Sequence, residues 1–463
     1  MNGTQFDSLR GQVRGQIITP GDAGYDAARA VFNGMIDKRP AAVAQVSQVA
    51  DVISCVNFAR DNSLDLAVRG GGHSAPGFGT WDDALVIDFS NMTGVRVNPA
   101  AATARAEPGA TWADFNHATH AFGLATPGGI VGSTGIAGLT LGGGIGYLSR
   151  KYGLSCDNLL SADVVTAEGK FLTASESENE DLFWALRGGG GNFGVVTSFE
   201  YRMHPVDMVH AGIIIYPIEH AETVARFYRD YMATAPEEFG AFLGFHQGPP
   251  VPFLPEEWHG KPVCVIVGMW TGDPAEGPAR WQPFLDAAPA AGSMVGPMPY
   301  PALNSAFDPL QPPGMQAYWK ADFLAELNDG AIAAHIEHGS KVPSVQTAVH
   351  LYPIDGAVQR VGATDTAFAN RNVKFSPVIA AQWMDPAENE ANIAWVRDYA
   401  AALRPYSAPG GYINFMDGDD LPRVAENYGP NYIRLREVKA KYDPQNLFHV
   451  NQNIAPAGTQ VST

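Results

Sequence analysis

Two glycine-rich segments constrain how this chain can fold. Glycine accounts for 50 of the 463 residues, well above the roughly 7% of an average protein, and it is clustered. The first cluster is VRGGGHS at residues 68–74, and the second is TPGGIVGSTGIAGLTLGGGIGYLSRKYG at 126–153. The second segment is too rich in glycine for a regular element and too apolar for a solvent loop. We therefore expect it to be buried against its own core or against a ligand.

Consecutive glycines after a strand let several backbone N–H groups converge on an anion, because no Cβ intervenes. Gly70, Gly71 and Gly72 follow the apolar run LDLAV and fit such a phosphate cradle, with Arg69 either adding charge or bracing the loop. A simple tight turn is the alternative, but it leaves the second segment unexplained. The two segments together favour a large, flat cofactor that carries phosphate, and His73 is placed to meet its ring system.

Charge and cysteine content exclude several classes of protein. The 30 basic and 48 acidic residues give a net charge of −18, which disfavours nucleic-acid binding. The three cysteines are far apart and form no CxxC pair, so neither a disulfide framework nor a zinc site is predicted. No apolar run reaches 18 residues and no signal sequence is apparent, so we expect a cytoplasmic protein without a membrane segment.

The periodicity of apolar residues predicts three regions. In residues 1–206 we expect a helix over 41–62, strands at 64–70 and 84–90, hairpins at 94–110 and 162–175, helices at 111–123 and 178–190, and a strand at 194–203. In residues 207–427 long apolar strands alternate with amphipathic helices, as in an α+β substrate domain. Residues 428–463 read as a helix stopped by Asp443-Pro444 and a strand-like tail.

Three common functional motifs are either in the wrong structural context or absent. Gly189-x-Gly191-x-x-Gly194 matches the dinucleotide fingerprint, but a helix precedes it and a strand follows it, so a Rossmann site is rejected. The pairs His117/His120 and His335/His338 lack a third ligand, and no metal site is predicted. The chain also lacks a GxSxG elbow, which weakens a serine hydrolase interpretation.

Four blocks of sequence resemble the FAD-linked oxidases related to berberine bridge enzyme. They are VRGGGHSAPGFGTWDDALVIDFSNM (68–92), TGIAGLTLGGGIGYLSRKYGLSCDNLLSADVVTAEG (134–169), DLFWALRGGGGNFGVVTSFEYRMHPV (181–206) and YGPNYIRLREVKAKYDPQNLFHVNQNI (428–454). The resemblance implies an α+β fold with a PCMH-type FAD-binding domain of two α/β subdomains. A substrate domain with a helix-covered antiparallel sheet follows, and the C-terminal segment returns to the FAD domain.

The resemblance also implies roles for individual residues. His73 would attach covalently to the 8α-methyl carbon of FAD, and the neighbouring loop would bind the pyrophosphate. Val195 would contact the adenine, and Asn451 and Asn453 would close over the cofactor. The full set of implied cofactor-binding residues is Arg69, Gly70, Gly71, Gly72, His73, Ser74, Gly128, Gly129, Ser133, Thr134, Gly138, Gly142, Gly143, Gly144, Val195, Asn451 and Asn453.

Many members of this family carry a second, cysteinyl link to the flavin. Val131 stands where that cysteine would be, so a single link through His73 is predicted, as in the bacterial branch that includes 6-hydroxynicotine oxidase and antibiotic-pathway oxidases. Thr134 occupies the position that gates oxygen in relatives. A small polar residue there fits oxygen reactivity, and it does not decide between release of peroxide and insertion of oxygen.

The substrate half offers fewer signals. Tyr412 and Asn414 resemble a YxN motif whose tyrosine helps to remove a hydroxyl proton, and Lys320 is the candidate cation beside it or an ordinary surface lysine. Strand alternation suggests that Asp355 and Gln382 face the flavin. The aromatic residues Trp319, Trp383 and Phe415 are candidates for a substrate wall or for the core.

The favoured function is an FAD-dependent oxidase. It would pass a hydride from a C–H bearing O or N of a small organic substrate to flavin N5, with reoxidation by O2 to hydrogen peroxide. The alternatives are a monooxygenase or oxidative cyclase of secondary metabolism, and a non-catalytic flavoprotein or carbohydrate-binding protein. Substrate identity and oligomeric state are not indicated by the sequence.

Overall fold

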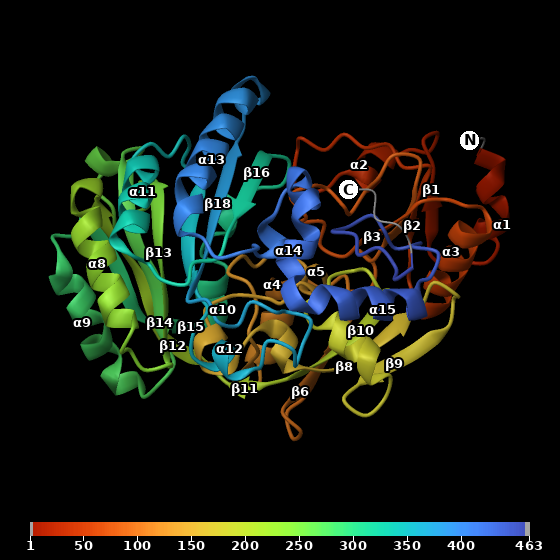
Figure 1. Ribbon diagram of the computed structural model, residues 1–463, viewed down its shortest axis with the longest axis horizontal. Coiled ribbons are helices and arrows are strands. Elements are labelled where there is room, and N and C mark those ends of the chain that lie inside the picture. Colours follow the sequence, from red (N-terminus) through yellow and green to blue (C-terminus); the bar gives the residue numbers. More distant parts are fainter. Residues whose placement is uncertain (1–2, 459–463) are drawn as a thin grey trace.

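The computed structural model describes residues 3–458 and has a mixed α and β architecture. Three sheets are built from residues 16–205, and one large sheet is built from residues 208–383 (Figure 1). The predicted boundary at 206/207 falls between the last small strand and the first long one, and it stays a prediction. Within the described part of the chain, no helix is both long enough and apolar enough to cross a membrane.

The first sheet carries the glycine loop. Its order is β1 (Gln16–Ile18), β2 (Ala42–Gln45), β4 (Leu85–Asp88) and β3 (Leu66–Arg69), with β2 and β3 parallel to β4. The helix expected over 41–62 was therefore wrong in its first part, because AVAQ pairs on both sides as a strand. Helix α3 (Val49–Asp61) starts after this strand, and in its first turn the carboxylate of Asp51 accepts the backbone N–H groups of Arg14, Gly15 and Ser47.

The second sheet is antiparallel and lies beside the first. Its order is β5 (Val95–Asn98), β6 (Thr103–Ala106), β10 (Val195–Arg202), β8 (Leu159–Val165) and β9 (Phe171–Ser175), while β7 (Leu124–Ala125) pairs separately with β11 (His204–Pro205). Segment 126–153 is buried as expected, but it contains two short helices, α5 (Ile136–Leu141) and α6 (Ser149–Tyr152), joined by a glycine turn. Helices α4 (Trp112–His120) and α7 (Glu180–Leu186) complete this part.

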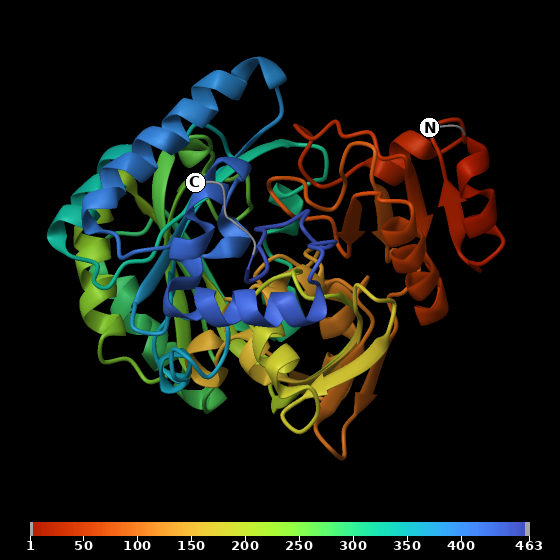
Figure 2. The same ribbon diagram turned by 45° about the vertical axis from the view of Figure 1, so that its right-hand side comes forward.

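The large sheet has seven antiparallel strands. In spatial order they are β15 (Gly292–Pro299), β12 (Met208–Pro217), β14 (Pro262–Trp270), β13 (Phe239–Gln247), β17 (Ala348–Pro353), β18 (Phe375–Trp383) and β16 (Gln316–Ala321). Four helices lie on one side of it: α8 (Ala221–Met232), α9 (Gly277–Ala287), α11 (Asp329–Gly339) and α13 (Asn389–Leu403) (Figures 1 and 2).

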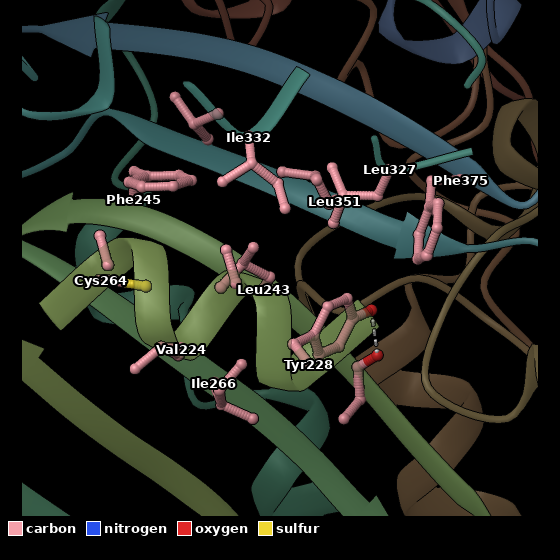
Figure 3. Close-up of a cluster of buried hydrophobic side chains, with 14 of the residues drawn as sticks. Val224, Tyr228, Leu243, Phe245, Cys264, Ile266, Leu327, Ile332, Leu351 and Phe375 are labelled. Atoms are coloured by element: carbon pink, nitrogen blue, oxygen red, sulfur yellow. Dashed lines mark hydrogen bonds between the residues drawn. The ribbon is translucent and has the colours of Figure 1, made fainter. Parts of the chain in front are cut away.

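The hydrophobic core between the sheet and its helices is well defined. Figure 3 shows Val224 and Tyr228 of α8 against Leu243, Ile266 and Leu351 of the sheet. The Tyr228 hydroxyl donates to the carbonyl of Ala241, so the buried phenol is satisfied. Alternate residues of β16, β17 and β18 belong to this core, which leaves the other residues of these strands to face the rest of the protein.

The C-terminal segment returns to the first half of the chain. After α14 (Val424–Tyr428), helix α15 (Tyr432–Tyr442) lies beside the first half of the chain (Figure 1) and packs against α7. The tail that follows it forms no strand in its described part, contrary to the prediction, because its polar groups bond to side chains and loops rather than to a ladder. The remaining short helices are α1 (Asp7–Arg10), α2 (Tyr25–Arg29), α10 (Tyr300–Asn304) and α12 (Ala357–Arg360).

Candidate functional site

A cavity of about 320 Å³ lies where the two halves of the molecule meet. Its walls come from the glycine loop after β3, from segment 129–145, from the turn at 190–196, from the C-terminal residues 448–452, and from the helix-free face of the seven-stranded sheet. A volume of this order is typical of small-molecule and cofactor sites. The cavity therefore joins the elements that the sequence marked as cofactor-binding to a separate, sheet-lined half.

The two glycine-rich segments meet backbone to backbone. A Cβ on Gly71 would lie 2.4 Å from the backbone nitrogen of Gly135, and a Cβ on Gly135 would lie 2.4 Å from that of Gly71. Gly72 has a φ of +70°, which favours glycine. Gly138, by contrast, has no atom within 4 Å of its Cβ position and lines the cavity. Gly71 and Gly135 are thus required for the close approach of the two segments, whereas Gly138 leaves open space where a ligand would lie.

Arg69 braces the loop. Its guanidinium pairs with the Asp88 carboxylate at 2.9 Å, and it also donates to the carbonyl oxygens of Ala28 and Ala30. The residue is buried, and these partners occupy its charge. A phosphate group in the cradle would therefore depend mainly on the backbone N–H groups of residues 70–74.

His73 lies directly after the cradle and lines the cavity. Its ring stacks on Phe32 at 4.3 Å between centroids, Nε2 is 3.1 Å from the Ser133 hydroxyl, and Nδ1 is 3.5 Å from the Thr134 hydroxyl. Burial lowers the pKa of His73 to about 4. At neutral pH the imidazole is uncharged and keeps a bare nitrogen, which is the form a nucleophile needs.

The turn Gly142–Gly144 lies outside the lining of this cavity, and its predicted role in cofactor binding stays a prediction. The turn contacts Tyr412 and Asn414. The N–H of Gly144 donates to the Tyr412 hydroxyl at 2.8 Å, and a Cβ on Gly142 would lie 2.1 Å from Oδ1 of Asn414. Asn414 in turn donates from Nδ2 to the same hydroxyl at 2.7 Å and to the carbonyl of Leu139 at 3.0 Å. Tyr412 and Asn414 both line the cavity, together with Thr134.

Lys320 does not reach Tyr412. Its ammonium forms ion pairs with Asp419 and Asp420, and it does not line the cavity. The reason is strand alternation, because Trp319 of the same strand does line the cavity. The prediction of Lys320 as the cation beside the tyrosine is corrected accordingly.

The other predicted substrate-side residues divide in the same way. Trp319, Phe415 and Gln382 line the cavity, and Gln382 donates from Nε2 to Gln311, another lining residue, at 2.6 Å. Asp355 pairs with Arg150 instead, and Trp383 is a core residue whose indole N–H donates to Asn389.

Several predicted cofactor residues lie outside the lining of this cavity. Gly128 packs on Trp112, and the Ser133 hydroxyl lies 3.1 Å from the His73 ring. Val195 belongs to a hydrophobic core, whereas its neighbours Gly194 and Val196 line the cavity. Asn453 is also outside the lining. The predicted residues that do line it are Arg69, Gly70, Gly71, Gly72, His73, Ser74, Gly129, Thr134, Gly138 and Asn451.

The structure adds residues that sequence reasoning missed. Gly190 and Gly191 line the cavity, so the motif rejected as a Rossmann fingerprint does face a ligand site, in a helix-then-strand setting. His350 and Tyr352 of β17 also line it. Their signal was present in AVHLYP, where polar residues two apart share one face of a strand.

The residues present fit FAD. The backbone cradle at 70–74 suits a pyrophosphate, and the Oδ1 of Asn451 is buried in the cavity lining without a partner among the described residues. None of the three cysteines lines the cavity; all are buried elsewhere, and Val131 occupies the wall near His73. Among the described lining residues there is thus no cysteine that could form a second link, and attachment through His73 stays a prediction.

Comparison with known proteins agrees with this assignment. Residues 40–175 match the family model of an FAD binding domain, and residues 411–455 match a model described as berberine and berberine like. The (R)-6-hydroxynicotine oxidase of Paenarthrobacter nicotinovorans is 32% identical, covering 96% of this chain and 98% of its own length. The carbohydrate oxidase of Microdochium nivale is 29% identical, covering 95% and 92%.

A solved structure extends the likeness to the fold. The BBE-like 1 protein of Physcomitrella patens superposes with a TM-score of 0.87 at 25% identity, covering 98% of this chain and all of that one. The glycine cradle, the cavity and these matches lead to one conclusion. The chain belongs to the berberine bridge enzyme-like family of FAD-linked oxidoreductases and has their PCMH-type fold.

Proposed function

We propose that this protein is an oxidase in which FAD is attached covalently through His73 alone. The observation that carries the proposal is the position of a neutral imidazole directly after the phosphate cradle and facing the cavity. Bound FAD would accept a hydride at N5 from a substrate C–H that bears O or N, and O2 would then take up the electrons to give hydrogen peroxide. Relatives named for oxidation of 6-hydroxynicotine and of carbohydrates support the reaction class.

This chain's own residues would bind and orient the reactants. The glycine cradle fixes the phosphate end, and the sheet face with Trp319, Phe415 and Gln382 receives the substrate. Tyr412, held by Gly144 and Asn414, presents a hydroxyl at the boundary between the two. Placing the reacting groups in fixed positions is the contribution of the protein.

The attachment is tested by acid precipitation of the purified protein. We expect a yellow pellet for the natural sequence. His73→Ala should bind FAD through the glycine segments but release it to the supernatant, because the nucleophile is absent. Ser74→Ala is the matched control and should leave the pellet yellow. A colourless pellet from the unsubstituted protein would refute the covalent link.

The oxygen chemistry needs a separate measurement. Peroxide formation, followed with a peroxidase-coupled dye, should equal substrate consumption in an oxidase. Incorporation of ¹⁸O from ¹⁸O2 into the product would instead identify a monooxygenase.

A further inference from the structure

Three buried polar side chains form a line that leads from the cavity into the large sheet. Tyr352 and His350 lie on β17, and His246 lies on β13, which pairs with β17. The Tyr352 hydroxyl is 2.8 Å from Nδ1 of His350, and Nε2 of His350 is 2.8 Å from Nε2 of His246. Tyr352 and His350 line the cavity, and His246 lies behind them, 5% exposed.

This geometry can pass a proton along the chain, and transfer toward His246 uses the tautomer in which His350 carries its proton on Nε2. A neutral imidazole has one N–H and one bare nitrogen. Because His350 is bonded at both nitrogens, it accepts at one and donates at the other. Burial lowers the pKa of His246 to about 4 and that of His350 well below its ordinary value, so both rings are neutral at pH 7.

Tyr412 is poorly suited to accept a proton. Burial raises the pKa of Tyr412 above its ordinary value and outweighs the hydrogen bonds from Gly144 and Asn414, which lower it, so the hydroxyl keeps its proton at neutral pH. Lys320 is held elsewhere by Asp419 and Asp420. A phenol with both lone pairs occupied can only donate.

The cavity offers few other acceptors. Among the described residues that line it, none is Asp, Glu or Lys, and Arg69 is paired with Asp88. His73 belongs to the cofactor end. The rings of Tyr352 and Tyr412 both pack on Phe415, at 5.7 and 4.8 Å between centroids, so the two tyrosines line one region of the cavity.

We propose that Tyr352, His350 and His246 form a proton-accepting chain for an uncharged, hydroxyl-bearing substrate, with Tyr412 as hydrogen-bond donor to the same substrate. The proposal rests on the oxidase function above. The hydroxyl proton passes to Tyr352, the Tyr352 proton to Nδ1 of His350, and the Nε2 proton of His350 to Nε2 of His246. FAD, when bound, would supply the acceptor for the hydride from the C–H bond, and the alcohol would become a carbonyl. Tyr352 is the catalytic residue, and the two histidines position it and take up its proton.

A weak base suffices for this step. As the hydride departs, the alcohol acquires the character of a protonated carbonyl, which is a strong acid. A neutral imidazole with a lowered pKa accepts such a proton, although it would not deprotonate a free alcohol. The absence of carboxylate and ammonium groups among the described lining residues fits an uncharged substrate, because a buried charge would need a partner.

The first test is the rate of anaerobic flavin bleaching in the FAD-loaded enzyme. The probes are glucose, cellobiose, xylobiose and benzyl alcohol, with gluconate and choline as charged counterparts. Tyr352→Phe and His350→Asn should lower the rate constant about 100-fold or more, the range of general acid–base catalysis, with little change in the substrate concentration for half-saturation. Asparagine retains a polar partner for Tyr352 but cannot pass the proton on.

The matched control is His335→Asn. His335 is equally buried and its Nδ1 lies 2.8 Å from the Tyr399 hydroxyl, but this pair is on the helix-covered side of the sheet. It should bleach at a rate within about twofold of the natural enzyme. Equal slowing in His335→Asn and His350→Asn would overturn the chain, and bleaching by the charged probes alone would overturn the substrate class.

A second test does not depend on turnover. In FAD-loaded protein labelled with ¹⁵N-histidine, Tyr352→Phe should shift the ring nitrogen signals of both His350 and His246 and leave those of His335 in place. Unchanged His350 and His246 signals would overturn the chain even if no probe bleaches the flavin. If no probe bleaches the flavin of the natural enzyme but the NMR signals shift as expected, the result would count against the oxidase function and in favour of the hydrogen-bonded chain.

Discussion

The buried pair of Lys439 and Asp443 gives the sharpest prediction about what holds the cavity together. The two side chains are 2.6 Å apart and 0% exposed. Lys439 also donates to the carbonyls of Asn192 and Phe448, at 2.8 and 2.9 Å. Asp443 accepts the backbone N–H groups of Leu447 and Phe448. One pair thus joins α15 to two segments that line the cavity.

Asp443→Asn should be costly. It leaves the Lys439 ammonium buried without its counter-charge, and breaking such a pair from one side costs about 3–5 kcal/mol in the free energy of unfolding. The control is Lys441→Gln on the same helix. Lys441 pairs with Asp181 at 2.6 Å but is 59% exposed, so its loss should cost about 1 kcal/mol or less.

Urea denaturation of the FAD-loaded protein measures both free energies. Replacing both partners, as Lys439→Met with Asp443→Leu, should recover part of the loss, because no buried charge remains. In the His73→Ala background, where FAD would be held without a covalent bond, we also expect Asp443→Asn to raise the amount of FAD released on dilution, since Asn192 and Phe448 line the cavity. An Asp443→Asn variant no less stable than Lys441→Gln would refute the reasoning.

Two further predictions concern the Tyr412 support and acid stability. Gly142→Ala would place a Cβ 2.1 Å from Oδ1 of Asn414, so it should lower the free energy of unfolding by about 1–3 kcal/mol and slow flavin bleaching. Gly296→Ala is the control, because its Cβ would lie in open space, and it should have neither effect. Equal effects of the two substitutions would contradict this prediction. Burial lowers the pKa of His246 to about 4 and of His335 to about 3, so these rings stay neutral in the folded state while unfolded ones titrate near 6.5. The contribution of these histidines to stability should be fully present above about pH 6.5 and should be lost as the pH drops toward 4. His335→Asn should make the urea midpoint fall less steeply over this pH range. A urea midpoint of the natural protein that does not change with pH would refute this prediction.

The cofactor end of the site was largely predictable, because its chemistry is local. Gly70–Gly72 and His73 are consecutive, and a backbone cradle needs only neighbouring residues. Val195 and Gly142–Gly144 lie outside the cavity lining, and their roles stay predictions. Whether a strand residue faces a cavity or a core depends on which sheet it joins, and a glycine turn can face either a ligand or a side chain.

The substrate end could not be predicted in the same way. Lys320 and Trp319 are adjacent in sequence and point to opposite faces of β16, so the choice between them required the sheet. His246 and His350 are 104 residues apart, and only the pairing of β13 with β17 brings their rings to 2.8 Å.

The sequence by itself determined the family and predicted a phosphate cradle with the histidine that follows it, because each depends on residues close together in the chain. Only the tertiary structure decided which polar groups share the substrate cavity. Contacts between distant strands depend on sheet order and register, and a register shift of one residue would turn Tyr352 and His350 from the cavity into the core.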